Sequence, residues 1–260
     1  MRRVLFKGPL PQRPENDILR EGNKNVVSSY VAVDLETTGL DPKKDKIIEI
    51  GAVLVLNGVI KDTYETFVNP YRKLEERITS LTGIRDEQLE SAPGIETVIG
   101  EFLDFAGKFP VLGHHVIFDY SFLKRAAVNG GHGFERQGID TLKLARRFMP
   151  PEAKKNLKDA CEFFEIKQEQ SHRALADSKS AHFLYQELVR RFGSNEPEAF
   201  ESQPLIYKVK KEQPASNRQK EHLQDLLKYH KIVLSVQTDH LSRNEISRIT
   251  DKIISQYGRI

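Results

Sequence analysis

The chain has 260 residues, of which 38% are hydrophobic and 30% charged, with a formal net charge of +3, a size that suits one domain or two small ones. The single cysteine, Cys161, excludes an intramolecular disulfide and a zinc site built on several thiolates, and it fits a reducing, cytoplasmic location. We expect neither a signal peptide nor a transmembrane helix, because no long apolar run follows the N-terminal arginines and no charge-free apolar stretch reaches about 20 residues.

The first third of the chain predicts an arm followed by three strands. Residues 1–29 hold three prolines and two glycines with few periodic apolar positions, which indicates an N-terminal arm. Tyr30–Leu35, Ile47–Leu56 and Val59–Val68 are rich in β-branched and aromatic residues, as strands are. Asn57-Gly58 between the last two is a strong hairpin signal, so these two strands are predicted to be antiparallel.

After the hairpin, short strands alternate with helices, which predicts an α/β fold: a mixed sheet with helices on its faces. Residues 193–217, with three prolines and no periodic pattern, are interpreted as a linker, and 218–260 as a small, mostly helical C-terminal module. The expected helices are Lys73–Leu81, Asp86–Leu89, Ile95–Phe105, one ending at Asn129, Thr141–Phe148, Asn156–Phe164 and Ala174–Phe192, and the expected further strands are Pro110–Gly113 and Ile139-Asp140.

Two acids end the first strand. Asp34 and Glu36 lie two residues apart, and because strand side chains alternate between faces, both carboxylates point the same way. Such a pair repels itself unless a cation lies between, and oxygen ligands suit Mg²⁺ or Mn²⁺ rather than zinc. Thr38-Gly39 then allows a tight turn that brings the backbone close to a ligand.

Two further clusters carry polar groups near expected helix starts. Asp119 follows Phe118 at the start of one helix, where an acid is also stabilised by the helix dipole alone. His172 precedes another helix and Asp177 lies inside it, next to that helix's apolar stripe. Taken singly, each of these acids is better explained by ordinary helix chemistry than by a functional site.

Together the clusters resemble the DEDDh, or DnaQ-like, 3′→5′ exonuclease superfamily, which contains the proofreading epsilon subunit of bacterial DNA polymerase III. The first motif, Asp-x-Glu-Thr-Thr-Gly-Leu, is matched throughout residues 34–40. The second, Gly-His-Asn followed by Phe-Asp, reads Gly113-His114-His115 and then Phe118-Asp119, and the third, His-x4-Asp, is matched by His172 and Asp177. The resemblance covers about residues 28–192, places the exonuclease domain at residues 30–192, and implies an RNase H-like fold with a five-stranded mixed sheet.

The resemblance also implies a mechanism with two divalent cations, Mg²⁺ or Mn²⁺, that clamp the oxygens of a phosphoryl displacement. Asp34 is expected to bridge both ions, Glu36 and Asp177 to serve the ion that holds the attacking water, and Asp119 to position the second ion. His172 is the expected general base, since an imidazole titrates near neutral pH.

Substrate contacts are implied for the turn of the first motif and for the second motif. Thr37, Thr38, Gly39 and Leu40 are expected to hold the terminal nucleotide, with Leu40 against the last base. His115 stands where the family often has asparagine, which puts that substrate contact in doubt. For Phe118, a place beside the base and a place in the core both stay open, and the core is favoured.

The expected partner is a 3′ end of DNA, single-stranded or frayed, trimmed during proofreading, replication or repair. Residues 1–29 and 211–260 each carry a net charge of +3, so these basic flanks are candidates for binding nucleic acid or a polymerase, repair or CRISPR-adaptation complex. Two alternatives stay open: an RNA 3′ exonuclease similar to the RNase T and oligoribonuclease groups, and a docking subunit whose nuclease domain mainly binds nucleic acid.

Overall fold

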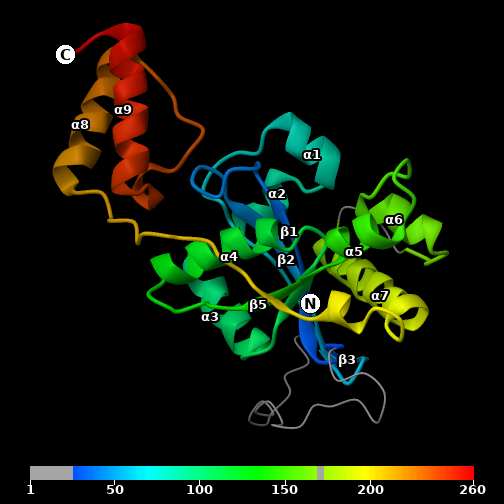
Figure 1. Ribbon diagram of the computed structural model, residues 1–260. Coiled ribbons are helices and arrows are strands. Elements are labelled where there is room, and N and C mark those ends of the chain that lie inside the picture. Colours follow the sequence, from blue (N-terminus) through cyan, green and yellow to red (C-terminus); the bar gives the residue numbers. More distant parts are fainter. Residues whose placement is uncertain (1–25, 169–172) are drawn as a thin grey trace.

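A computed structural model describes residues 26–168 and 173–260, and it is built around one six-stranded mixed sheet in the order β3-β2-β1-β4-β5-β6 (Figure 1). β1 runs parallel to β4 and β4 parallel to β5, whereas the other neighbours are antiparallel. The elements are β1 (Tyr30–Thr37), β2 (Ile47–Leu56), β3 (Val59–Phe67), α1 (Glu76–Thr82), α2 (Asp86–Glu90), α3 (Ile95–Ala106), β4 (Val111–Gly113), α4 (Ile117–Asn129), β5 (Gln137–Asp140), α5 (Thr141–Phe148), α6 (Leu157–Phe163), α7 (Ala174–Phe192), η1 (Pro197–Phe200), β6 (Gln203–Pro204), α8 (Asn217–His230), η2 (Thr238–His240) and α9 (Arg243–Tyr257). The predicted α/β fold class is confirmed.

Helices cover both faces of the sheet, and the alternation along β1 divides its side chains between them. Val31, Val33 and Leu35 pack into the core under α3 and α4. Tyr30 and Ala32 pack into the second core, under α5, α6 and α7. Since Asp34 and Glu36 continue the second set, the strand directs both carboxylates towards the side of α7.

The Asn57-Gly58 hairpin forms as the sequence predicts. β2 and β3 pair antiparallel from Glu49–Phe67 to Leu56–Val59. Asn57 and Gly58 both have positive φ, 52° and 76°, which is the signature of the two-residue turn that matches strand twist. The hairpin fixes the register of β2 against β3, and along its other edge β2 pairs with β1, where Glu49 lies opposite Glu36.

The interpretation of residues 193–217 as a bare linker, and the prediction of only five strands, are wrong. η1 buries Phe200 completely, and β6 pairs with β5 through Gln203 and Pro204 as a sixth strand. Leu205 packs against the first core. A strand of two residues that contains proline shows no period-two pattern, which is why the sequence did not predict it.

The N-terminal arm lies mostly outside the described residues, but its last part is bound to the sheet. Val26 is buried in the second core, and the hairpin turn donates from Asn57 N to Ser29 Oγ at 3.0 Å and from Gly58 N to Ser28 O at 2.8 Å. Residues 26–29 therefore belong structurally to the domain built around the sheet rather than to an arm.

The C-terminal module, residues 215–257, holds a core of its own, with α8 and α9 side by side at the end of an extended segment (Figure 1). Leu223, Leu226, Leu241, Ile246 and Ile253 are buried between its elements. Each helix begins with a capping box, Ser216 with Gln219 and Ser242 with Glu245. In the part of the chain that is described, no helix combines the length and apolar character needed to cross a membrane.

Candidate active site

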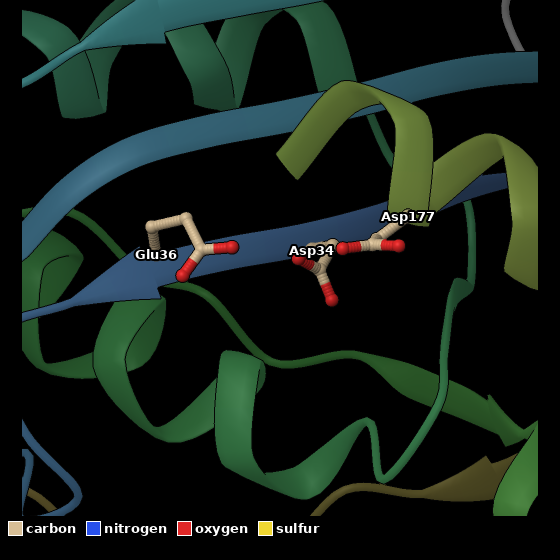
Figure 2. A group of neighbouring side chains, drawn as sticks. All are labelled: Asp34, Glu36 and Asp177. Carbon is tan, nitrogen blue, oxygen red and sulfur yellow. The ribbon is translucent and has the colours of Figure 1, made fainter. Parts of the chain in front are cut away.

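Three of the predicted site residues meet at the end of β1. Asp34 and Glu36 extend from β1, and Asp177 reaches them from the first turns of α7 (Figure 2). One carboxylate oxygen of each residue lies within 4.8 Å of those of the other two. Three oxygen ligands that converge in this way match the ligand preference of Mg²⁺ or Mn²⁺.

The close approach of α7 to the sheet depends on Gly51. A Cβ at this position of β2 would lie 2.0 Å from Leu175 N and 2.1 Å from Ala174 C, so no side chain fits there. Gly51 is paired with Asp34 across the sheet. The missing side chain therefore lets the start of α7 lie directly over the strand pair, which brings Asp177 to Asp34.

A buried ion pair fixes the same end of α7. Glu49 on β2 is fully buried, and its carboxylate accepts hydrogen bonds from Arg173 Nη2 at 2.8 Å, from Arg173 Nε at 3.1 Å and from Ala174 N at 3.1 Å. Glu49 lies opposite Glu36, where two carboxylates would otherwise repel. Arg173 thus neutralises Glu49 and anchors the helix that carries Asp177.

Asp119, the fourth predicted carboxylate, is buried at the start of α4, outside the group of three. It still raises the pKa of Asp34 by its charge, so the two carboxylates are electrostatic neighbours. Its side chain accepts backbone hydrogen bonds, including one from Leu35, the residue between Asp34 and Glu36. The structure therefore joins the start of α4 to the end of β1 at this carboxylate.

The crowding of acids shifts their protonation. Burial raises the pKa of Asp34 well above its usual range, and the charges of the neighbouring carboxylates raise it further. Burial and the charge of Asp177 raise the pKa of Glu36 from 4.5 to about 7. Burial likewise raises the pKa of Asp119. Without a cation this site retains protons, and a divalent cation would favour its ionised form.

The turn after β1 is tightly closed and carries an exposed side chain. Thr37 Oγ1 donates to Gly39 O at 2.7 Å, and Thr38 N donates to Lys46 O at 2.9 Å. A Cβ on Gly39 would lie 2.5 Å from the Asp45 carboxylate, so a side chain there would displace this carboxylate, which accepts a hydrogen bond from Asp41 N within the turn. Leu40 is 83% exposed, so the turn that follows Glu36 presents an apolar side chain to solvent.

The two histidines of the second motif differ in their surroundings. His114 is held between Thr141 Oγ1 at 3.0 Å and Lys155 O at 2.7 Å, and burial lowers its pKa. His115 is exposed with φ 73°, and its backbone N donates to Asp140 Oδ1 at 3.0 Å. His115 therefore presents its imidazole to solvent near the ends of β4 and β5, whereas His114 is half-buried, is held by these two hydrogen bonds and lines the cleft into which the carboxylates open.

Phe118 is half-buried, packs against the first core and has its ring 5.1 Å from that of Phe122. His172 lies outside the described residues. The carboxylates open into a cleft of 420 Å³ that is also lined by Asn156 and Lys158 of the α6 region. Neither of these two residues, nor Glu49, stands out in the sequence, because each is brought to the site only by tertiary contacts.

Comparison with known proteins decides the family. The family model described as "Exonuclease" matches residues 31–185, well over half of the chain. The chain belongs to the exonuclease family. Its motifs and its relatives identify the matched region as a DnaQ-like 3′→5′ exonuclease domain, as the sequence resemblance predicted, and this metal-dependent family fits the carboxylate group of the site.

The relatives with the higher identities are polymerases. The chain is 39% identical over 171 residues to "DNA polymerase III PolC-type" of Caldanaerobacter subterraneus subsp. tengcongensis, and 35% identical over 184 residues to that of Staphylococcus aureus. These matches cover 66% and 70% of this chain but only 12% of each polymerase. The exonuclease thus spans a small part of the length of these relatives.

Solved structures share the fold. Exonuclease X in complex with 5′ overhanging duplex DNA matches with a TM-score of 0.54 and 24% identity, over 65% of this chain and 96% of that one. E. coli exonuclease I in complex with a dT13 oligonucleotide matches with a TM-score of 0.56 and 16% identity, over 67% of this chain and 43% of that one. A 3′-exonuclease that recognises a histone mRNA stem-loop matches with a TM-score of 0.53 and 22% identity, over 64% of this chain and 84% of that one.

Proposed function

We propose that this exonuclease removes nucleotides from the 3′ end of DNA, at single-stranded or frayed ends, using Mg²⁺ or Mn²⁺. The observation that carries the proposal is the convergence of Asp34, Glu36 and Asp177 at the end of β1. The relatives above 30% identity are DNA polymerases, which favours DNA as the substrate.

The carboxylates would hold the cations, with Asp34 central because it neighbours both Asp177 and Asp119. When bound, divalent ions supply positive charge to the scissile phosphate and increase the acidity of a water molecule. The chain's own part is orientation. Arg173 and Gly51 hold Asp177 in place, and the Leu35 backbone holds Asp119.

Recognition of the terminal nucleotide is assigned to the turn after β1. Thr37, Thr38 and Gly39 are fixed by the turn's hydrogen bonds, and exposed Leu40 is free to pack against the last base. His115 is assigned a further substrate contact because its side chain is exposed near the ends of β4 and β5, and Phe118 supports the site from the core. His172 would accept the proton of the attacking water, a role that rests on the family motif.

The setting of this activity is proposed to be the cytoplasm, in replication proofreading or repair. The polymerase relatives suggest a polymerase or repair complex as partner. The division into an exonuclease domain and a C-terminal module, which has its own core, leaves the module as the candidate docking part. A CRISPR-adaptation complex is the other candidate assembly.

A 5′-labelled single-stranded DNA, incubated with Mg²⁺, Mn²⁺ or EDTA, tests the activity. We expect a metal-dependent ladder that shortens from the 3′ end and disappears in Asp34→Ala and His172→Ala. Asp104→Ala, which changes an exposed aspartate on α3, serves as the matched control and should retain the ladder. Binding of the DNA without any ladder would instead favour the docking-subunit alternative.

RNA of the same sequence separates the two substrate classes. The similarity in fold to an mRNA 3′-exonuclease is the observation that keeps RNA as the second candidate. We expect faster shortening of DNA than of RNA. Shortening of RNA alone would replace the DNA assignment with the RNA exonuclease function.

A further inference from the structure

The C-terminal module lies against the segment that borders the turn after β1. Tyr71 and His240 stack with ring centroids 3.4 Å apart. Two backbone bonds run alongside, from Gln237 N to Tyr71 O at 2.8 Å and from Lys73 N to Ser235 O at 2.9 Å. The module is therefore fixed in register on residues 71–73 rather than tethered only by the chain before it.

A buried glutamate stands at the centre of this contact. The Glu245 side chain is 7% exposed, and its Oε1 lies 2.8 Å from Lys46 Nζ and 3.3 Å from Arg72 Nη2. Oε2 accepts from Ser242 N at 2.9 Å, which closes the capping box of α9. Burial pushes the pKa of Glu245 upward, but Lys46 and the bonds from Ser242 together hold it below its ordinary value. One carboxylate therefore caps a helix of the module and neutralises two cations of the exonuclease domain.

Lys46 is the residue that closes the turn. Its backbone is bonded twice to Thr38, through Thr38 N to Lys46 O at 2.9 Å and Lys46 N to Thr38 Oγ1 at 3.0 Å. The segment between them carries Leu40. A change in the position of Lys46 is thus transmitted to Thr38 and to the segment that carries Leu40.

The module makes further contacts to the same segment. Arg72, which is bound to Glu245 through Nη2, donates from Nη1 to Lys44 O at 3.2 Å. Arg248 Nη2 of α9 donates to Lys43 O at 3.5 Å. Residues 43, 44 and 46, in the second half of the turn just before β2, are therefore bound to α9 either directly or through Arg72. These bonds end on the turn, residues 38–46, and not on β1 or α7. The contact between the module and the turn, here called the clamp, therefore acts on the turn rather than on the elements that carry the three carboxylates.

We propose that Glu245 is a positioning residue for the substrate: through Lys46 and Arg72 it fixes residues 38–46, so that Thr38 and Leu40 meet the terminal nucleotide. This inference rests on the proposed exonuclease function. Removing the carboxylate charge leaves two cations facing each other in a poorly solvated place, and their repulsion opens the base of the turn. Substrate affinity should then fall while the chemistry of the carboxylate group is retained.

Glu245→Gln tests this with little change of shape. Glutamine also closes a capping box, so α9 keeps its cap while the charge is lost. Ser242→Ala is the matched control, because it removes the capping hydroxyl bonded to Glu245 N and keeps the charge. On single-stranded DNA we expect Glu245→Gln to raise KM on the order of fivefold with kcat within about twofold, and Ser242→Ala to change neither. Glu245→Asp should restore part of the affinity.

Amide hydrogen exchange supplies a second readout that needs no activity. The amides of Thr38 and Lys46 should exchange several times faster in Glu245→Gln than in the unchanged protein, and at the unchanged rate in Ser242→Ala. Unchanged exchange and unchanged KM in Glu245→Gln would overturn the positioning role. Faster exchange in a protein that cuts neither DNA nor RNA would remove the proposed function while leaving the clamp of the turn established.

Discussion

Two sites with buried or half-buried carboxylates in this protein differ in the direction in which the pKa values are shifted. At the end of β1, Asp34, Glu36 and Asp177 crowd together, and the pKa values of Asp34 and Glu36 are raised. At the contact of the C-terminal module, Glu245 lies between Lys46 and Arg72, and its pKa is lowered.

The difference lies in where the compensating charge comes from. Glu245 receives its cations from the chain itself, so the contact is complete as folded. The group at β1 has Arg173 near it, but that guanidinium is bound to Glu49. Asp34 and Glu36 nevertheless keep raised pKa values, which a bound divalent cation would lower, and this is the arrangement expected of a metal site and not of a structural contact. Substitutions and pH changes at the β1 site can break or sharpen this contrast.

The largest effect is expected from Asp177→Asn. Losing one of the three converging charges should lower the rate of 3′ shortening about 10³-fold, within the range found when one electrostatic group is removed from an active site. Initial rates on single-stranded DNA measure it. Glu187→Gln, farther along α7, is the control, and equal losses in both variants would mean that the helix rather than the charge matters.

Arg173→Ala should be the most destabilising change near the site. It leaves Glu49, whose side chain is 1% exposed, as a buried charge without a cation, which costs about 3 kcal/mol. Urea unfolding measures this free energy. Arg190→Ala, on the same helix, breaks an ion pair whose arginine is exposed, so little change is expected there. Similar losses in the two variants would contradict the anchoring role of Arg173.

The stability of the metal-free protein should fall as pH rises through the acidic range. The pKa of Glu36 is raised from 4.5 to about 7, so between these values the unfolded chain ionises while the folded protein keeps its proton. The stability that Glu36 contributes is complete below pH 4.5 and is lost once the pH has risen to about 7. A bound divalent cation favours the ionised group, so Mn²⁺ should raise the melting temperature by about 5 °C more near neutral pH than at about pH 5. If Mn²⁺ raised the melting temperature by the same amount at both pH values, the ion would be binding elsewhere.

Leu40→Ala is expected to have the smallest effect on the protein itself. The side chain is 83% exposed, so stability should stay within about 0.5 kcal/mol. Loss of a base contact of about 1 kcal/mol would raise KM for DNA roughly fivefold. Ile206→Ala, which truncates another exposed aliphatic residue, is the control and should leave KM unchanged.

Local patterns determined most of the fold. Runs rich in β-branched and aromatic residues predicted β1 to β3, and helix patterns located α3, α4, α5 and α7 to within about two residues of their ends. The Asn57-Gly58 turn predicted the hairpin, because these two residue types tolerate the positive φ that the turn requires. The same alternation of side chains along a strand is sufficient to place Asp34 and Glu36 on one face.

Only the tertiary structure decided which groups meet across the chain. The approach of α7 over Gly51, the Glu49–Arg173 pair beneath it, the short strand β6 and the placement of Glu245 beside Lys46 join residues far apart in sequence. A local period reports which face a side chain occupies, but it contains no information on which other element will cover that face. For this reason the sequence by itself determined the type of chemistry and the residues that carry it, and the packing decided how those residues are held, charged and joined to the C-terminal module.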